Sequence, residues 1–290
     1  MSAVWLEVAL NGAWGQARQP LMPIRVKDIV AEGIACAKEG AAIIHVHAYD
    51  EDSGTQNDDW QIYARIIEGI RNGCDSLVYP TIPLSGSGYA NNHAEMRFKH
   101  VHELAKRGLI EMTVLDTGSV NFIRYDQMDD IKNGFIYMNP PGDIESGFEI
   151  ANQYNLVPGY AIYEPGFTRL AAALTRKNSL KRKPVYRFMF SEEFAWGFPP
   201  SVQFLESHLA LLHAEDPDAH WMIAGLGVDI SPLIEQTVKK YGHIRVGLED
   251  APWGTTLRNI DWVRKTVQAI KHYGANPAPA RDVRQTLEFI

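Results

Sequence analysis

The chain has 290 residues, of which 46% are hydrophobic and 22% are charged, and its formal net charge is −7. This balance is typical of a soluble globular protein and argues against nucleic-acid binding. No run of 18 apolar residues and no charged start followed by an apolar run occurs, so we expect no membrane span and no signal peptide. Cys36 and Cys74 have no metal or redox spacing, which fits a reducing cytoplasm.

Short apolar segments rich in β-branched residues recur along the whole chain. Their near-continuous hydrophobicity is typical of parallel strands that are covered on both faces. Eight strands are predicted in this way: Val4–Leu10, Ala42–His47, Ser76–Ile82, Met112–Leu115, Val157–Tyr163, Val185–Phe190, Trp221–Leu226 and Ile244–Glu249.

Amphipathic segments with apolar residues at helical spacing lie between these strands. The predicted helices are Lys27–Lys38, Trp60–Arg71, Met96–Lys106, Asp143–Tyr154, Phe167–Leu174, Pro200–His213, Ile230–Tyr241 and Arg258–His272. Eight β/α units predict an α/β fold of the (β/α)₈ TIM-barrel type, with residues 1–290 as one domain. A doubly wound open sheet is the alternative, but it does not explain why polar residues gather at the strand ends.

Three segments do not fit this simple count. Gly134–Met138 is apolar and is either an extra strand or a buried loop. The segments Ala48–Asp59 and Pro83–His93 are long and polar, and in a barrel such loops after the strands build the active site. A basic cluster is either a solvated helix end or a local anion site; it comprises Arg176, Lys177, Lys181, Arg182 and Lys183.

His45 and His47 stand two positions apart at the end of the second predicted strand. Residues i and i+2 of a strand point to the same face, so both imidazoles project together. Two neutral imidazoles on one face can bind Zn²⁺, and a third ligand would complete a catalytic site that keeps an open position. A lone strand histidine is more often structural, but a pair that closes a buried strand favours metal binding.

The last predicted strand also ends in polar groups, with Arg245, Glu249 and Asp250. In a closed barrel the eighth strand is next to the first, and the second strand lies on the first strand's other side. Glu249 is therefore within reach of both histidines and completes a His₂Glu zinc set. The alternative is a solvated acidic pair that is bridged to Arg245, and spacing alone leaves the two interpretations equal.

Arg245 and Asp250 would perform proton chemistry beside the metal, with Asp250 as general base. Zinc would act as a Lewis acid on a substrate carbonyl, which suits carbon–carbon bond cleavage in a keto acid or hydrolysis. Metal-dependent amidohydrolases also use a His-x-His pair, but they place it on the first strand and add histidines from strands five and six. Strands five and six end here without histidine. A zinc hydrolase, a retro-aldolase and a non-enzymatic binding barrel remain alternatives.

Several segments, in order and at characteristic separations, resemble the family of β-keto acid cleavage enzymes, whose founding activity is 3-keto-5-aminohexanoate cleavage. Each segment alone is a weak signal, and the set covers most of the chain. The segments are Asn11–Ala13, Gly40–His47, Met112–Phe122, Val157–Glu164, Trp221–Gly227 and His243–Asp250.

The resemblance implies a zinc-dependent (β/α)₈ barrel that converts a β-keto acid and acetyl-CoA into acetoacetate and a new acyl-CoA. It implies that His45, His47 and Glu249 bind zinc and that Arg245 and Asp250 form the catalytic pair. It also suggests a homotetramer. The positions that it places near the substrate are Trp14, Thr81, Asp116, Ser119 and Asn121.

The sequence departs from the founding enzyme at several of these positions. Trp14 and Ala161 each stand where that enzyme has a glutamate suited to the ammonium group of its substrate. Neither can form an ion pair with a cation, although Trp14 could stack on a quaternary ammonium. Val114 replaces a threonine, Tyr49 replaces an arginine, and the segment 191–200 replaces a glycine-rich loop. We therefore expect a β-keto acid with a less polar or uncharged tail.

Overall fold

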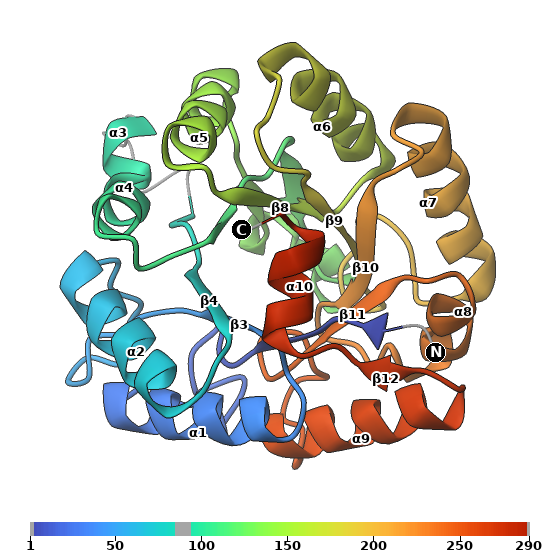
Figure 1. Cartoon of the computed structure of the whole chain (residues 1–290). Coiled ribbons are helices and arrows are strands. Elements are labelled where there is room, and N and C mark those ends of the chain that lie inside the picture. The colour runs from blue at the N-terminus through green and yellow to red at the C-terminus, as the bar shows by residue number, and fades with distance from the viewer. Residues whose placement is uncertain (1–2, 85–93, 289–290) are drawn as a thin grey trace.

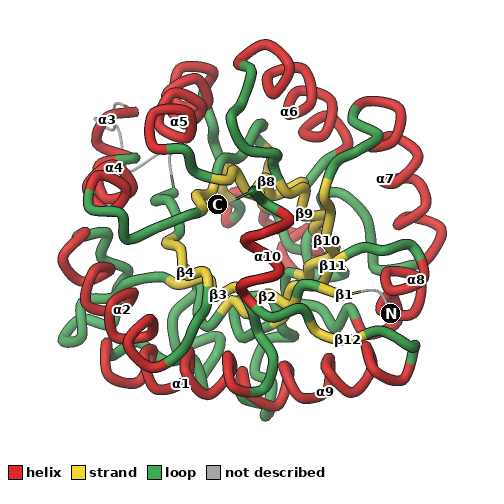
Figure 2. Tube along the Cα trace, in the orientation of Figure 1, coloured by secondary structure: helices red, strands yellow, loops and turns green. Residues whose placement is uncertain are grey.

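The computed structural model describes residues 3–84 and 94–288. Its central sheet has eight parallel strands in the order β4-β3-β2-β11-β10-β9-β8-β5, and the two end strands contact each other, so that the sheet curls into a barrel (Figure 2). The prediction of a (β/α)₈ TIM barrel is thus confirmed. The barrel strands are β2 (Leu6–Ala9), β3 (Ile43–Val46), β4 (Leu77–Pro80), β5 (Met112–Val114), β8 (Val157–Ile162), β9 (Val185–Phe190), β10 (His220–Gly225) and β11 (His243–Val246).

Helices surround the barrel on its outer side (Figure 1). The longer helices present an apolar stripe to the strands, as α2 shows with buried Tyr63, Ile66, Ile67 and Ile70. The helices are α1 (Val26–Lys38), α2 (Trp60–Gly73), α3 (Ala94–Arg97), α4 (Lys99–Lys106), α5 (Pro141–Tyr154), α6 (Pro165–Asn178), α7 (Val202–Glu215), α8 (Ile234–Lys239), α9 (Asn259–His272) and α10 (Ala280–Thr286).

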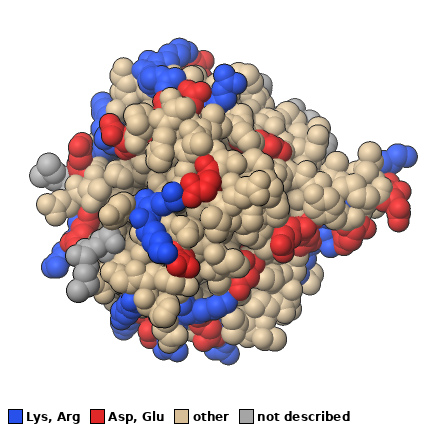
Figure 3. Space-filling model, turned by 90° about the vertical axis from the view of Figure 1, so that its right-hand side faces the viewer, with Lys and Arg blue, Asp and Glu red and all other residues tan. Residues whose placement is uncertain are grey.

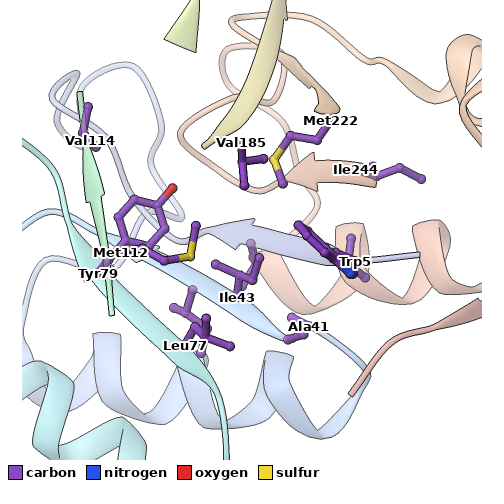
Figure 4. Close-up of a cluster of buried hydrophobic side chains, with 14 of the residues drawn as sticks. Trp5, Ala41, Ile43, Leu77, Tyr79, Met112, Val114, Val185, Met222 and Ile244 are labelled. Carbon is purple, nitrogen blue, oxygen red and sulfur yellow. The ribbon is translucent and has the colours of Figure 1, made fainter. Parts of the chain in front are cut away.

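The barrel interior is apolar toward the amino ends of the strands. Figure 4 shows Ile43, Met112, Val185 and Met222, from β3, β5, β9 and β10, gathered in this region. All four side chains are at most 1% exposed. Burying them drives closure of the barrel, since apolar area removed from water contributes about 25 cal/mol per Å².

Several elements differ from the sequence prediction. The predicted strand Val4–Leu10 is divided into β1 (Ala3–Val4), which pairs with β12 (Asn276–Pro277), and β2. The predicted helix Met96–Lys106 is divided into α3 and α4. The 3₁₀ helices η1 (Tyr125–Asn133) and η2 (Ser231–Leu233) were not predicted separately, and α10 was not predicted at all.

The segment Gly134–Met138 contains an extra strand outside the barrel. There β7 (Phe135–Tyr137) pairs antiparallel with β6 (Val120–Phe122). This ribbon belongs to the long connection after β5 and carries Phe122 and Phe135 to the carboxyl end of the barrel, where both line a cavity. Residues 85–93 of the polar segment Pro83–His93 lie outside the described residues.

The amino end of the barrel is covered by α10, which crosses it in Figure 1. Arg284 of this helix lies 2.6 Å from Glu111 and donates a hydrogen bond to the carbonyl of Ser76, and both of these residues directly precede barrel strands. No described helix is long and apolar enough to cross a bilayer. Figure 3 shows basic and acidic side chains interspersed over one face of the molecule.

Candidate active site

A cavity of about 70 Å³ opens at the carboxyl end of the barrel. Its lining comes from strand ends and from the loops that follow them. One part of the lining is polar and comprises His45, His47, Gln56, Thr81, Asp116, Arg187, Arg245 and Glu249. The other part is apolar and aromatic and includes Trp14, Phe122, Phe135, Tyr163, Met189 and Leu226. The cavity therefore has one end suited to a charged group and one end suited to an uncharged tail.

Three potential metal ligands converge at the polar end. His45 lies in β3, His47 follows it, and Glu249 follows β11. Their ligand atoms all lie within 4.8 Å of one another. Glu249 Oε2 is 3.5 Å from Nε2 of His45, and Glu249 Oε1 is 3.3 Å from Nε2 of His47. β2 separates β3 from β11 in the sheet, so the carboxylate reaches the imidazoles across one intervening strand.

Buried amides hold the two strand ends in place. Asn11 accepts a hydrogen bond from the backbone N–H of His47 (2.8 Å) and donates one to its carbonyl (3.0 Å). Asn259 accepts from the N–H of Leu248 (2.7 Å) and donates to the carbonyl of Leu10 (2.8 Å), which fastens the end of β11 to the end of β2. Because these bonds satisfy backbone groups that would otherwise be buried unpaired, they fix the ligand positions.

The ring orientation of His47 is set by Gln56, whose Oε1 lies 2.8 Å from Nδ1. If Nδ1 carries the proton, Nε2 presents its lone pair toward Glu249 and His45, as a metal ligand requires. Burial lowers the pKa of His45 well below its usual value and keeps that imidazole neutral. For His47 burial acts in the same direction, but the Glu249 carboxylate outweighs it and raises the pKa.

Glu249 is the negative centre of the group. Burial favours its protonated form, but Arg245 and the two histidines outweigh that effect and lower its pKa. The carboxylate is therefore ionised, and its buried Oε2 forms no hydrogen bond with any described residue, although Arg245 Nη2 lies 2.9 Å away. Two imidazoles and an ionised carboxylate are the donor set of catalytic zinc sites. These residues fit a bound zinc ion.

Arg245 is bonded to carboxylates through all three of its nitrogens. Nε and Nη2 donate to the two oxygens of Asp250, at 2.7 and 2.8 Å, and Nη1 donates to Glu7 at 3.3 Å. Burial, with Glu249 and Glu7 nearby, raises the pKa of Asp250 against the opposing effect of Arg245. Arg245 lines the cavity, whereas Asp250 is absent from the described residues that line it. The predicted pair exists, with Arg245 facing the cavity.

The predicted substrate-binding positions fall into two groups. Trp14, Thr81 and Asp116 line the cavity. Asp116 is already bonded, since it accepts hydrogen bonds from the Tyr137 hydroxyl (2.5 Å) and from the N–H of Ala161 (2.8 Å). Ser119 and Asn121 are not among the described residues of the lining. Ser119 instead exchanges hydrogen bonds with the backbone of Asn139, and Asn121 lies exposed in the β6–β7 ribbon.

Sequence reasoning missed Gln56 and a buried polar group formed by Glu7, Tyr79 and Arg187. The Tyr79 hydroxyl donates to Glu7 Oε1 (2.6 Å), and Arg187 Nη2 lies 3.3 Å from Glu7 Oε2. One signal was present, because Glu7 and Arg187 are charged residues inside otherwise apolar strands. Such residues are rarely buried without a partner.

The fold and site together define a class: a barrel enzyme with a candidate metal centre at the carboxyl ends of its strands and two buried arginines that line the same cavity. The sequence matches the beta-keto acid cleavage enzyme family over residues 3–289. The chain therefore belongs to the family of β-keto acid cleavage enzymes.

Two relatives illustrate this similarity. The chain is 26% identical over 276 residues to a 3-keto-5-aminohexanoate cleavage enzyme of Fusobacterium nucleatum, and the match covers 93% of this chain and 92% of the relative. It is 26% identical over 246 residues to a 3-oxoadipate:acetyl-CoA acetyltransferase of Cupriavidus necator, with coverage of 84% and 79%. Among solved structures, ObcA in a binary complex with oxaloacetate has a TM-score of 0.72 at 16% identity, covering 94% of this chain and 68% of that chain. The structural match supports the fold alone.

Proposed function

We propose that this protein is a zinc-dependent β-keto acid cleavage enzyme that uses acetyl-CoA and releases acetoacetate and a new acyl-CoA. The observation that carries the proposal is the convergence of His45, His47 and Glu249 beside Arg245 in one cavity. The family match and the acetyl-CoA-dependent activity in the name of the Cupriavidus relative support the choice of reaction.

In this reaction the keto acid loses a proton from C2, and the resulting carbon nucleophile attacks the acetyl carbonyl as the CoA thiolate leaves. The thiolate then attacks the original ketone, and the C2–C3 bond breaks. A proton returns to C2, which gives acetoacetate, while the remainder of the substrate leaves as acyl-CoA. When bound, zinc would polarise the substrate ketone as a Lewis acid.

Arg245 faces the cavity, where its guanidinium would stabilise negative charge that develops on substrate oxygens. Asp250 holds this guanidinium through two hydrogen bonds and so fixes its orientation. Its role as general base stays a prediction. Arg245 and Asp250 should be replaced singly and together, because the effects of substitutions on kcat do not add for residues that act as a unit.

The apolar end of the cavity favours a substrate with an uncharged tail. Trp14, Phe122 and Phe135 pack against one another there, with ring centroids 5.0 to 6.5 Å apart. The Arg18 guanidinium lies 5.8 Å from the Trp14 ring centroid, so a cationic tail stacked on Trp14 would meet a like charge nearby.

A substrate panel tests the proposal. The purified protein, with its zinc content measured, would be given acetyl-CoA and β-keto acids with uncharged tails of increasing length, together with 3-oxoadipate and 3-keto-5-aminohexanoate. Chromatography with mass detection would follow acetoacetate and the new acyl-CoA. We expect kcat/KM to be higher for the uncharged tails than for the two charged ones. Preference for 3-keto-5-aminohexanoate would refute the tail assignment, and product formation without acetyl-CoA would instead indicate a hydrolase or retro-aldolase.

Assembly as a homotetramer and location in the cytoplasm are further parts of this proposal. Both come from the sequence and its resemblance to the family. Sedimentation of the purified protein would measure the oligomeric state directly.

A further inference from the structure

We propose that Arg187 binds the carboxylate of the β-keto acid. This inference rests on the proposed function and deepens it by assigning the group that anchors the charged end of the substrate. Arg187 lies in β9, lines the same cavity as His45 and Arg245, and is 1% exposed. A group that reaches it must therefore enter the barrel.

The side chain of Arg187 crosses the barrel interior. From β9 it reaches Tyr79 of β4, to whose hydroxyl Nη2 donates a hydrogen bond of 2.6 Å, and Glu7 of β2, at 3.3 Å. In the strand order these two strands lie on either side of β3, across the barrel from β9. Gly159 leaves room for this course, because a Cβ there would stand only 3.1 Å from Nη2.

Arg187 retains donors that the protein does not use. Its only hydrogen bonds within the described residues are formed by Nη2, and its Nε is buried without any partner. In Arg245, by contrast, all three nitrogens donate to carboxylates. A buried donor without an acceptor is costly, and an entering carboxylate would satisfy it.

The charge of Arg187 is also only partly compensated. Glu7 is the one carboxylate within ion-pair distance of Arg187 among the described residues, and Arg245 shares it through Nη1, also at 3.3 Å. With zinc bound beside Glu249, as proposed, an anion is thus favoured over a neutral carbonyl as the ligand of Arg187. Because the residue is buried at the inner end of a small cavity, a carboxylate of the acid substrate fits better than the bulky phosphates of CoA.

The test measures binding of two probes to the zinc-loaded protein by titration calorimetry. Acetoacetate is the proposed product and carries the carboxylate, and methyl acetoacetate has the same skeleton without the charge. We expect the native protein to bind acetoacetate at least tenfold more tightly. Arg187→Met should weaken acetoacetate binding by about 10- to 100-fold, as expected for hydrogen bonds to a charged group, and leave the ester within about twofold.

Removing Arg187 alone leaves the buried carboxylate of Glu7 without this ion-pair partner. The double variant Glu7→Gln/Arg187→Met is therefore measured in parallel. Zinc content and melting temperature are checked for both variants. Native-like acetoacetate affinity in either folded variant would overturn the assignment, as would an equal loss for both probes. The assignment is also overturned if the native protein does not bind acetoacetate more tightly than methyl acetoacetate. A different result separates the two proposals. If the native protein prefers acetoacetate and the variants lose that preference, but no acetyl-CoA-dependent cleavage occurs, the proposed reaction is refuted and Arg187 remains a carboxylate site.

Discussion

Gly12 allows the loop after β2 to pack directly against Glu249, a proposed zinc ligand. The substitution Gly12→Ala therefore tests how precisely Glu249 must be positioned to bind zinc. A Cβ at this residue would lie 2.6 Å from Cγ of Glu249 and 3.3 Å from its Cα. Carbon atoms pack best at about 3.5 to 4.0 Å, so Glu249 would have to retreat by roughly 1 Å. Its backbone cannot follow freely, because its N–H donates to the carbonyl of Ala9 and the preceding residue is held by Asn259.

Metal–ligand distances tolerate deviations of only about 0.2 Å. We therefore expect Gly12→Ala to lower zinc affinity by about 10- to 100-fold, which corresponds to about 1.4 to 2.7 kcal/mol. Competition with a chromophoric chelator measures the change. Gly166→Ala is the matched control, because no atom of the described residues outside its chain neighbours and helix backbone lies within 4 Å of a Cβ there. Unchanged zinc affinity in a folded Gly12→Ala protein would refute the reasoning.

Three further predictions concern the supports of the site and the outer barrel. Gln56→Ala should lower zinc affinity by about 10- to 100-fold, because the hydrogen bond that orients His47 is lost; chelator competition measures it. Asp250→Asn should reduce kcat by at least about 100-fold with zinc retained, which assays and metal analysis would show together. His208 is buried between aromatic rings, neither of its ring nitrogens bonds to a described residue, and burial lowers its pKa from 6.5 to about 4. As the pH falls below about 6.5, His208 gains a proton in the unfolded chain but not in the folded protein. The free energy of unfolding of the native protein therefore decreases by up to about 3 kcal/mol by pH 4. His208→Phe should lose correspondingly less stability between pH 7 and pH 4.5 in urea unfolding.

Each of these predictions has a discriminating result. His213→Gln, on the exposed side of the same helix, should keep the native pH dependence of stability. Equal pH dependence in His208→Phe and the native protein would contradict the account of His208. An Asp250→Asn protein with native kcat would remove Asp250 from the mechanism, and a Gln56→Ala protein with native zinc affinity would show that His47 needs no orienting partner.

The barrel and the convergence of the three candidate metal ligands were predictable because each depends on local pattern. The apolar run that ends in His45 and His47 defines both a strand and a shared face, and the eighth strand ends in Glu249 by the same logic. The closed order of the barrel then brings the ends of β3 and β11 together. Nothing about individual contacts is needed for that step.

The environment of each charged residue was not predictable in the same way. Asp250 was predicted to pair with Arg245 and to act as general base. The pairing is present, but the direction of its carboxylate relative to the cavity was not predictable, since strand alternation does not determine the orientation of a residue beyond the strand end. Ser119 was expected beside the substrate on the strength of a loop position. The antiparallel ribbon formed by β6 and β7 gives its hydroxyl a backbone partner at Asn139 instead. Ribbon pairing depends on side chains that are distant in sequence, which a local pattern does not contain.

The buried network of carboxylates and guanidiniums is costly to desolvate, but its net charge suits the proposed reaction. Three carboxylates, those of Glu7, Glu249 and Asp250, contact two guanidiniums, those of Arg187 and Arg245, so this network carries one surplus negative charge. A surplus charge in a dry interior is unfavourable unless a counter-ion accompanies it. In the zinc-loaded protein that we propose, a dication beside Glu249 would reverse the surplus to one positive charge. The network would then favour entry of a single substrate carboxylate, and the open donors of Arg187 offer a place for it.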